Sequence, residues 1–409
     1  MIKICDGLNF PTSLCFDRAG HIYIAESGLP FDGAPPGGRV LKVEDNGVSC
    51  LVDNLRPPLN GLRHHNDDLL IAEGGEPGRL SRYNLGSKTH QIILDGLPGG
   101  GNYHTNILIQ GPDNKLYFGQ GAATNSGIVG PDANMLAWLK RLPHPYDIPG
   151  FDIILSGENG RAINPETGGE IVTGPFMTFG EAGTKGQTIK GQLPCTAAIM
   201  RCNPDGSELE LFAWGLRNPF GLEFLKDGRL LAVDLGMNDR GSRPVGNGPD
   251  SIFHVESGKY YGWPDFIIGR SVTDAQFQSN RTESPTLKPL LTNHSTFGDL
   301  AQPLIDFAPH AAPTRFAVHP ESGDLYVAMF GDKRPFTGIE GPRAGRHLLR
   351  INLEMQEQTI IADLPLHRPI DLAFHPETHQ LYVLDFGQYE MGGDGSFSAQ
   401  RETGAIWRV

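Results

Sequence analysis

The chain lacks several features that define common protein classes. Its 409 residues contain no apolar run of about 18 or more, so the sequence predicts no membrane-spanning helix. Sustained apolar periodicity of the helical kind is almost absent, which argues against a mainly helical fold. Basic residues are in the minority, and the net charge is −13. Because phosphate binding needs a basic surface, nucleic acid is not an expected partner, whereas a neutral small molecule is.

Cysteine is also sparse, and the five thiols form no C-x-x-C pair; their odd number leaves at least one of them free. The first residues, "MIKICDGLNFPTSL", have no apolar signal-peptide core. The sequence as written therefore predicts a cytoplasmic protein, or a periplasmic or secreted one if a leader has been removed. The motifs G-x-S-x-G and H-E-x-x-H are missing, which disfavours a serine hydrolase or a zinc protease.

Glycine and proline, by contrast, are abundant at 53 and 32 residues, as is typical of a turn-rich all-β protein. One pattern recurs six times: a short apolar stretch, a turn, and a second apolar stretch. We expect each copy to form a β-hairpin. The copies are "SLCFDRAGHIYIAE", "GLRHHNDDLLIAE", "NILIQGPDNKLYFGQ", "GLEFLKDGRLLAVD", "RFAVHPESGDLYVAM" and "DLAFHPETHQLYVLD".

The spacing of the copies predicts a β-propeller. The second stretches of the first three copies begin at Ile22, Leu69 and Leu116, 47 residues apart, which is the length of one four-stranded blade. We therefore predict an all-β fold, a six-bladed propeller with four-stranded blades, as one domain over residues 1–409 with a long insertion at about 122–200. The C-terminal "ETGAIWRV" is expected to share a blade with the N-terminal strand and close the ring. A pair of β-sandwiches is the alternative, but it does not explain six equivalent hairpins.

A second regularity lies a fixed number of residues before the second apolar residue of each first stretch. Proline stands at this position in five copies, and His104 stands there in the third. Proline suits the start of an inner strand, because it fixes φ and needs no hydrogen-bond partner there. The residues just before these positions would ring one mouth of the central channel. This predicts His104, Arg217 and Asn218 on neighbouring blades, with Arg56, His367 and Arg368 on the same rim.

These residue types have useful chemistry at a channel mouth. A neutral histidine can accept a proton, and an arginine can hold an oxyanion or a carboxylate. The structural alternatives are a loop hydrogen bond for His104 and an interblade salt bridge for Arg217. The loop "DLGMNDRGSRPVGNGPD" at 234–250 is rich in oxygen donors, so it is either a candidate Ca²⁺ site or an ordinary polar loop.

Three motifs together carry a family resemblance: "AWGLRNPFGLEF", "GPDNKLYFGQG" preceded by His104, and "SGKYYGWPDF". In them the chain resembles the soluble quinoprotein sugar dehydrogenases, which include glucose and sorbosone dehydrogenases that use pyrroloquinoline quinone (PQQ). The resemblance extends over nearly all of the chain. It implies an oxidoreductase that oxidises a sugar, or a sugar-derived alcohol or aldehyde, with PQQ and Ca²⁺ as cofactors.

The resemblance also implies roles for individual residues. His104 would be the general base, Arg217 would hold the reacting quinone oxygen, and Asn218 would bond the cofactor beside it. The remaining PQQ carboxylates would be neutralised by basic residues drawn from Arg368, Lys333, Arg334 and Arg401. Ca²⁺ would be held by the carbonyls of Gly236 and Met237 or by those of Gly248 and Pro249, unless the metal site is lost.

Two other functions compete with this interpretation. One is a Ca²⁺-dependent lactonase or esterase of the six-bladed type, which needs several inward Asp, Glu and Asn side chains on the channel. The predicted rim is richer in Arg and His. The other is a propeller without catalysis that serves as a binding module, and the presence of both His104 and Arg217 on the rim argues against it.

Overall fold

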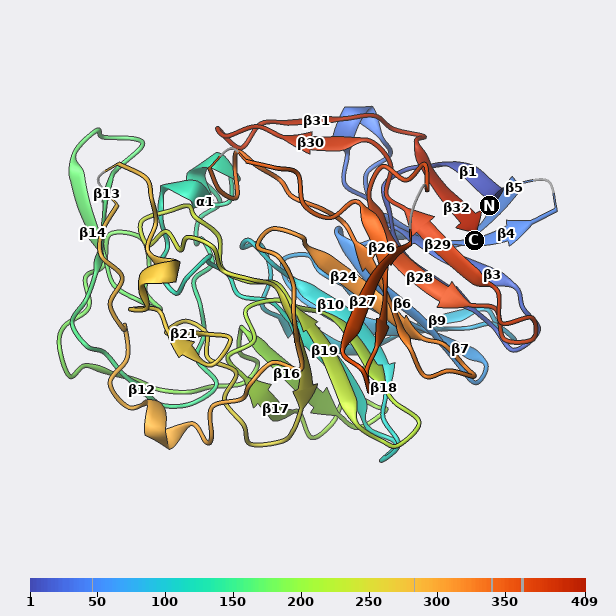
Figure 1. The fold of residues 1–409 in the computed structure, drawn as a ribbon, viewed down its shortest axis with the longest axis horizontal. Helices are drawn as coiled ribbons and strands as arrows, with labels where there is room; N and C mark the ends of the chain where they lie inside the picture. The colour runs from blue at the N-terminus through green and yellow to red at the C-terminus, as the bar shows by residue number, and fades with distance from the viewer. Residues whose placement is uncertain (46, 283, 340, 362–363) are drawn as a thin grey trace.

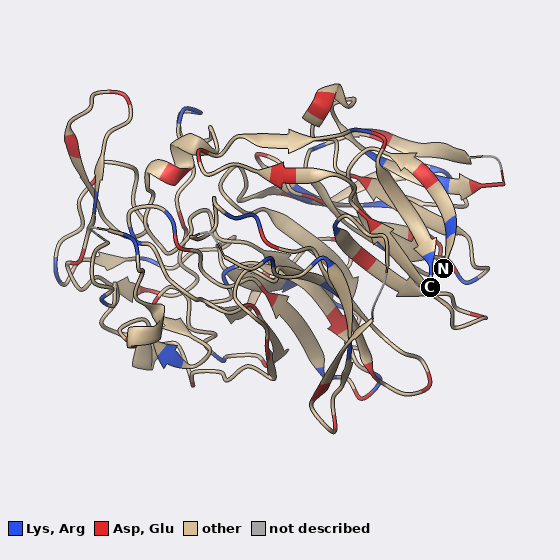
Figure 2. Cartoon of the chain, turned by 45° about the horizontal axis from the view of Figure 1, so that its top comes forward, with Lys and Arg blue, Asp and Glu red and all other residues tan. Residues whose placement is uncertain are grey.

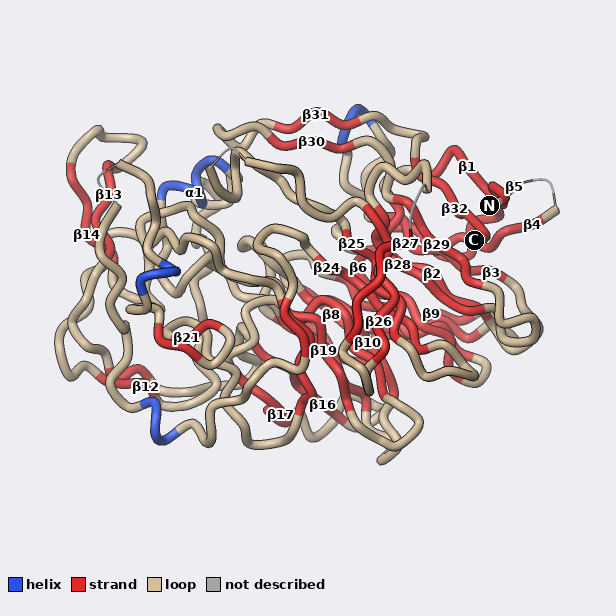
Figure 3. The backbone as a smooth tube through the Cα atoms, in the orientation of Figure 1, coloured by secondary structure: helices blue, strands red, loops and turns tan. Residues whose placement is uncertain are grey.

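The computed structural model describes residues 1–45, 47–282, 284–339, 341–361 and 364–409. Their architecture is a β-propeller of six four-stranded antiparallel sheets (Figure 1), as predicted. Strands gather on one side of the molecule, and a loop-rich region extends from the other (Figure 3). Among the described residues, no helix has the length and apolar character needed to cross a membrane.

The six blades follow one another along the chain, and their strands are given from the inner to the outer one. Blade 1 consists of β2 (Pro11–Phe16), β3 (Ile22–Glu26), β4 (Gly38–Glu44) and β5 (Gly47–Leu55), and blade 2 of β6 (Leu59–His65), β7 (Asp68–Glu73), β8 (Gly78–Asn84) and β9 (Thr89–Leu97). Blade 3 consists of β10 (Thr105–Gln110), β11 (Leu116–Gln120), β16 (Ala198–Cys202) and β17 (Glu210–Trp214), and blade 4 of β18 (Pro219–Phe224), β19 (Leu230–Asp234), β20 (Ser251–Val255) and β23 (Ile305–Asp306). Blade 5 consists of β24 (Pro313–Val318), β25 (Leu325–Met329), β26 (His347–Asn352) and β27 (Glu357–Ile361), and blade 6 of β28 (Pro369–Phe374), β29 (Leu381–Asp385), β32 (Gly404–Arg408) and β1 (Ile2–Leu8).

Blade 6 closes the ring. The C-terminal strand β32 pairs with β29 on one side and with the N-terminal strand β1 on the other, so the two chain ends lie together (Figure 1). The inner strands β2, β6, β10, β18, β24 and β28 contact one another in this order around the central channel. Neighbouring blades cover both faces of the second strands, so β3, β11 and β29 are buried at every position. This explains why the second stretch of each repeat is the more continuously apolar one.

The loop-rich region is formed by two long connections. Residues 121–197 lie between the paired strands β11 and β16, and residues 256–304 lie between β20 and β23. They contain short hairpins, β12 (Ile153–Ile154) with β15 (Thr188–Ile189), β13 (Gly160–Ile163) with β14 (Glu170–Thr173) and β21 (Phe266–Ile267) with β22 (Arg270–Ser271), together with helix α1 (Pro131–Met135). A fourth hairpin, β30 (Tyr389–Met391) with β31 (Phe397–Ala399), precedes β32.

Strand pairing corrects the predicted alignment of the repeats by one residue in two blades. In blade 4, Pro219 at the start of β18 pairs with Asp234 at the end of β19. The equivalent pairs are Leu59 with Glu73 in blade 2 and Thr105 with Gln120 in blade 3. Thr105, not His104, therefore occupies the position of the prolines. His104 lies one residue earlier, at the position equivalent to Asn218 in blade 4 and Arg368 in blade 6. The same irregular pairing follows the start of every inner strand, so it does not cause the shift. Instead, β6 and β10 place the polar residues His64 and Gln110 where β2 and β18 have Phe16 and Phe224, so an alignment on apolar residues is one residue off.

A carboxylate at the end of the second strand recurs around the rim. Asp234 accepts hydrogen bonds from the backbone N–H groups of Arg217 (3.1 Å) and Asn218 (2.7 Å). Asp385 does the same for the two residues before Pro369, at 2.8 Å each. Glu26 and Glu73 each hold one such N–H group. These bonds fix the loops that lead into the inner strands, and so they fix the side chains at the channel mouth.

Candidate active site

A cavity of about 280 Å³ opens at the end of the channel where the inner strands begin. It brings together four of the predicted site residues, His104, Arg217, Gly236 and Lys333. The remaining lining comes from loops of several blades: Phe31, Asn102, Tyr103, Leu136, Leu235, Asn238, Arg240, Asp250, His310, Ala312, Gly331, Asp332, Phe336, Thr337, Tyr389 and Met391.

Arg217 lies at the wall of this cavity and is almost fully buried. All five of its guanidinium hydrogens have acceptors in the protein. Nε donates to the carbonyl oxygen of Asn125 (2.9 Å), Nη2 donates to the side-chain oxygens of Asn125 (2.8 Å) and Asn238 (3.1 Å), and Nη1 donates to the carbonyl oxygens of Leu235 (3.2 Å) and Gly236. The guanidinium is therefore held rigidly, and burial lowers its pKa.

Asn125 connects two of the motifs that carry the family resemblance. Its backbone carbonyl accepts hydrogen bonds from Nε of Arg217 and from the indole N–H of Trp263 (3.3 Å), and its side-chain oxygen also accepts from the N–H of Asn238. Trp263 belongs to the "YGWP" turn, where the hydroxyl of Tyr260 donates to the carbonyls of Gly262 (2.7 Å) and Trp263 (3.0 Å). The long connection from blade 3 thus forms the back of the site.

His104 reaches the cavity from the loop before β10. Its Nδ1 atom is buried and has no hydrogen-bond partner among the described residues. Burial, together with the nearby positive charge of Arg141, lowers its pKa to about 4, so the imidazole is neutral at neutral pH. The adjacent residue, Tyr103, stacks its ring 4.5 Å from the guanidinium carbon of Arg217. Gln120 bonds to Thr105 (2.9 Å) rather than to His104.

The cavity carries more positive than negative charge. Lys333 lies near three guanidinium groups, and burial followed by these charges lowers its pKa to about 8. Arg240 contributes a second buried cation, which is paired with Asp132 and stacked on Phe336. Of the two lining carboxylates, Asp332 is neutralised by arginines, and burial raises the pKa of Asp250 to about 6. Such a lining favours an anionic ligand. On the rest of the molecule, acidic and basic residues are interspersed (Figure 2).

The structure places the other predicted cofactor-binding residues outside this cavity. Asn218 is buried behind it, where its side-chain oxygen accepts a hydrogen bond from Asn106 (2.9 Å). Arg368 donates to the carbonyls of residues 330–332 and to Glu390, and it lines a separate polar cavity. Arg334 bonds to Asp332 and Pro342. Arg401 is exposed, beside Gly33.

The four residues predicted to hold a metal lie against one another. A Cβ atom on Gly236 would collide with the carbonyl oxygens of Gly248 and Pro249, and one on Gly248 would lie 2.6 Å from the carbonyl oxygen of Met237. Only glycine fits at position 236, because the backbone of Gly248 and Pro249 approaches it closely. Its own carbonyl accepts from Arg217, and its N–H donates to Asp250 (2.7 Å). Among the described residues, no group of three or more His, Cys, Asp or Glu side chains could hold a metal ion.

Five residues of the site were not singled out from the sequence: four that line the cavity, Asn238, Arg240, Asp250 and His310, and Asn125, which bonds to Arg217. All of them lie in irregular loops, where no repeat marks them. His310 is comparable to His104, because its Nδ1 atom is buried without a partner among the described residues and burial lowers its pKa. Its place three residues before Pro313 on the inner strand of blade 5 was the one available signal.

Comparison with known proteins agrees with this picture. Residues 149–328, which include Arg217 and the "YGWP" turn, match the family described as glucose/sorbosone dehydrogenase. The resemblance inferred from the sequence is thereby confirmed. No curated protein matches the chain significantly.

Solved structures with the same fold match over almost the whole chain. A putative oxidoreductase (glucose dehydrogenase) from Thermus thermophilus has 18% identity and a TM-score of 0.56, covering 100% of this chain and 98% of its own. The PQQ-bound aldose sugar dehydrogenase of Streptomyces coelicolor has 15% identity and a TM-score of 0.59, covering 100% and 96%. The PQQ domain of a pyranose dehydrogenase from Coprinopsis cinerea has 13% identity and a TM-score of 0.56, covering 99% and 93%. At these identities the likeness establishes the fold.

Proposed function

We propose that the chain is a quinoprotein oxidoreductase that oxidises a sugar, or a sugar-derived alcohol or aldehyde, with PQQ as its cofactor. The observation that carries the proposal is the joint placement of a neutral imidazole, His104, and a rigidly held guanidinium, Arg217, in one cationic cavity. The match to the glucose/sorbosone dehydrogenase family supports it, as do the PQQ-dependent sugar dehydrogenases that share this fold.

The residues of the cavity fit a flat anionic quinone. Lys333 and Arg240 supply positive charge for carboxylates, and Phe31, Tyr103 and Phe336 supply aromatic surface. The buried Nδ1 atoms of His104 and His310 and the buried Nε of Arg240 have no partner among the described residues, so the site has unused polar atoms in the places where a polar ligand would contact it.

In the mechanism, His104 accepts the proton of the substrate hydroxyl on a ring nitrogen. It is competent for this because its low pKa keeps it neutral, and the same low pKa makes it a weak base, so proton transfer must accompany oxidation of the substrate carbon. PQQ, when bound, supplies the quinone carbon that accepts the hydride. Arg217 keeps a fixed positive charge beside the cavity, which stabilises an anionic oxygen there without reorganisation.

Calcium is the second cofactor that the resemblance implies, and backbone carbonyls are the donors available for it. The carbonyls of Gly248 and Pro249 approach Gly236, that of Met237 approaches Gly248, and oxygen donors of this kind suit Ca²⁺. We propose these three as ligands, whereas the carbonyl of Gly236 is already bonded to Arg217. Bound Ca²⁺ would supply a further positive charge next to the anionic cofactor.

The lactonase alternative finds less support, since that chemistry calls for several carboxylates on the channel. Only Asp250 and Asp332 line the described cavity, and the second is engaged by Arg334, Arg343 and backbone N–H groups. A binding module without catalysis would not explain why His104 is left unpartnered beside Arg217.

Equilibrium titration with PQQ tests the proposal directly. We expect quenching of tryptophan fluorescence to saturate at micromolar PQQ in the presence of CaCl₂, and to weaken when EDTA replaces the metal. Lys333→Met should reduce the affinity about 10-fold, because a charge-assisted contact is worth about 1.5 kcal/mol. Arg401→Met, at an exposed site outside the cavity, is the matched control and should bind as the wild type does.

Reduction of the bound cofactor by candidate sugars separates binding from chemistry. His104→Asn should retain PQQ binding but lose most of the sugar-dependent absorbance change, because the proton acceptor is gone. A wild-type protein that does not bind PQQ with or without Ca²⁺ would refute the cofactor. A His104→Asn variant that turns over like the wild type would refute the base.

A further inference from the structure

A second set of charged residues lies inside the channel, below the cavity described above. Arg315, on the inner strand β24 of blade 5, is fully buried. Its Nη2 atom donates to the carbonyl oxygen of Asn60 (2.6 Å) on β6, which lies on the opposite side of the six-membered ring of inner strands. Its guanidinium carbon lies 4.3 Å from the ring centre of Phe220 on β18. Arg315 therefore extends across the channel from blade 5 to blade 2.

The positive charge of Arg315 has no carboxylate within ion-pair distance among the described residues. Its Nε and Nη1 atoms are buried and have no hydrogen-bond partner among these residues. Buried polar groups are normally satisfied, and an unpaired buried charge is among the most costly arrangements in a protein. The side chain therefore calls for a partner that the polypeptide does not provide.

The acidic group whose charge acts on Arg315, Asp371, is already engaged. It accepts hydrogen bonds from the hydroxyl of Ser13 (2.8 Å), the N–H of Leu14 (2.9 Å) and its neighbour's N–H, and it pairs with Arg63 (3.3 Å). Glu223 faces Arg63, and burial raises its pKa, which favours its neutral form. Asp371 is thus already paired with Arg63, and no carboxylate among the described residues pairs with Arg315.

The far mouth of the channel opens next to this cluster. A cavity of about 440 Å³ is lined there by Arg63 and Glu223, and by Phe316 and Leu372, which directly follow Arg315 and Asp371 in the chain. It lies at the opposite end of the inner strands from the cavity of His104. This cavity reaches Arg63 and Glu223 at the edge of the cluster, from the end of the channel opposite the proposed active site.

We propose that the channel binds one small monovalent anion of the halide class, chloride in most solutions, at the guanidinium of Arg315. The anion pairs with the guanidinium of Arg315 and accepts from its two nitrogens that have no partner in the described chain. A large or polyvalent anion does not suit the site, because the guanidinium is enclosed by Asn60 and Phe220 and its charge is single. The proposal does not depend on the function proposed above.

Halide dependence of stability tests this site. Thermal unfolding is followed at constant ionic strength while sodium chloride replaces sodium methanesulfonate. A single site predicts a saturable rise in Tm with chloride, which bromide reproduces, because a ligand that binds only the folded state stabilises it. Arg315→Met should abolish the halide dependence. Arg161→Met, at a side chain that is 77% exposed, is the matched control and should keep it.

A second measurement needs no variant. Crystals grown in sodium bromide should show one strong anomalous peak in contact with Arg315. A Tm that is independent of halide in the wild type, or an anomalous map with no peak at this residue, would show that water alone satisfies the guanidinium and would overturn the proposal. A halide dependence that persists unchanged in Arg315→Met would place the ion elsewhere and overturn it as well.

Discussion

At the scale of single residues, burial decides the protonation state of the cavity. The pKa of His104 falls to about 4 in the folded chain, against about 6.5 for an unperturbed histidine, so the folded state binds the proton less readily than the unfolded state. Stability associated with this residue is therefore complete above about pH 6.5 and is lost as the pH falls toward 4.

This gives a prediction for acid sensitivity. Between pH 7 and pH 5, His104 should contribute up to about 2 kcal/mol to the loss of unfolding free energy, and His104→Asn should be less acid-sensitive by that amount. Urea unfolding of both proteins at the two pH values measures the difference. An identical pH dependence in the two proteins would mean that His104 is hydrated like an unperturbed histidine.

Sequence reasoning found part of this cavity, and the reason is physical. His104 and Arg217 stand one and two residues before the inner strands of neighbouring blades, so pseudo-symmetry put both on one rim, and the structure brings them to one cavity. Asn218 lies on the same rim, but its side-chain oxygen accepts from Asn106 on the neighbouring inner strand, a contact between blades that the repeat does not reveal. Asn125, which orients Arg217, comes from a non-repeating loop, and no local pattern signals a contact over 92 residues.

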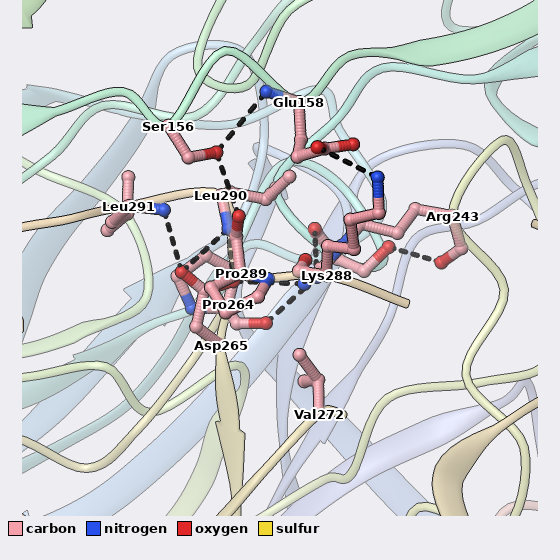
Figure 4. Close-up of polar contacts among 12 residues, drawn as sticks. Ser156, Glu158, Arg243, Pro264, Asp265, Val272, Lys288, Pro289, Leu290 and Leu291 are labelled. Atoms are coloured by element: carbon pink, nitrogen blue, oxygen red, sulfur yellow. Dashed lines mark hydrogen bonds and ion pairs between the residues drawn. The ribbon is translucent and has the colours of Figure 1, made fainter. Parts of the chain in front are cut away.

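At the scale of elements, a buried ion pair holds the loop-rich region together (Figure 4). The Asp265 carboxylate is fully buried, and it accepts from Nη2 of Arg243 (2.9 Å), from the N–H groups of Leu290 and Leu291, and from His294. Arg243 in turn donates to carbonyls of Ser126, Pro264 and Lys288. The pair thus joins the blade 3 connection, which carries Asn125, to the blade 4 connection.

Removing one partner of the Arg243–Asp265 pair should therefore lower the free energy of unfolding. Arg243→Met leaves a buried carboxylate unpaired, and we expect a loss of about 3 to 5 kcal/mol of stability, with faster hydrogen exchange at Leu290 and Leu291. The neighbouring Lys288–Glu158 pair (3.1 Å) is solvent-exposed, so Lys288→Met is the matched control and should cost at most about 1 kcal/mol. Equal effects of the two substitutions would contradict the role of the buried pair.

The elements themselves were predictable to different degrees. The two inner strands of each blade carry a continuous apolar signal, because they are covered by neighbouring blades, and all six pairs were found. The outer strands, such as β9 with four exposed residues in succession, lack this signal. The one-residue shift at Leu59 and Thr105 was missed because β6 and β10 carry polar residues, His64 and Gln110, at the position where the other inner strands have an apolar one.

At the scale of the whole molecule, the propeller depends on its closure. The only contact that joins the two ends of the chain into one blade, among the described residues, is the pairing of β1 with β32, where Cys5 lies opposite Ile406. Ile406 is fully buried between blades 6 and 1, whereas Ile2, paired on the same two strands, is 53% exposed. These two isoleucines allow the closure to be tested with one kind of substitution.

Ile406→Ala should lower the free energy of unfolding by about 2 to 5 kcal/mol, because it opens a cavity in the core of the closing blade, and Ile2→Ala should change it by less than about 0.5 kcal/mol. Since each blade contacts its two neighbours around a ring, we expect the loss to be global. Fluorescence of tryptophans in the loop-rich region and circular dichroism of the blades should therefore shift together during denaturant unfolding of Ile406→Ala. If only the circular dichroism shifted while tryptophan fluorescence kept its wild-type midpoint, the blades would unfold independently, and ring closure would be a local feature of blade 6.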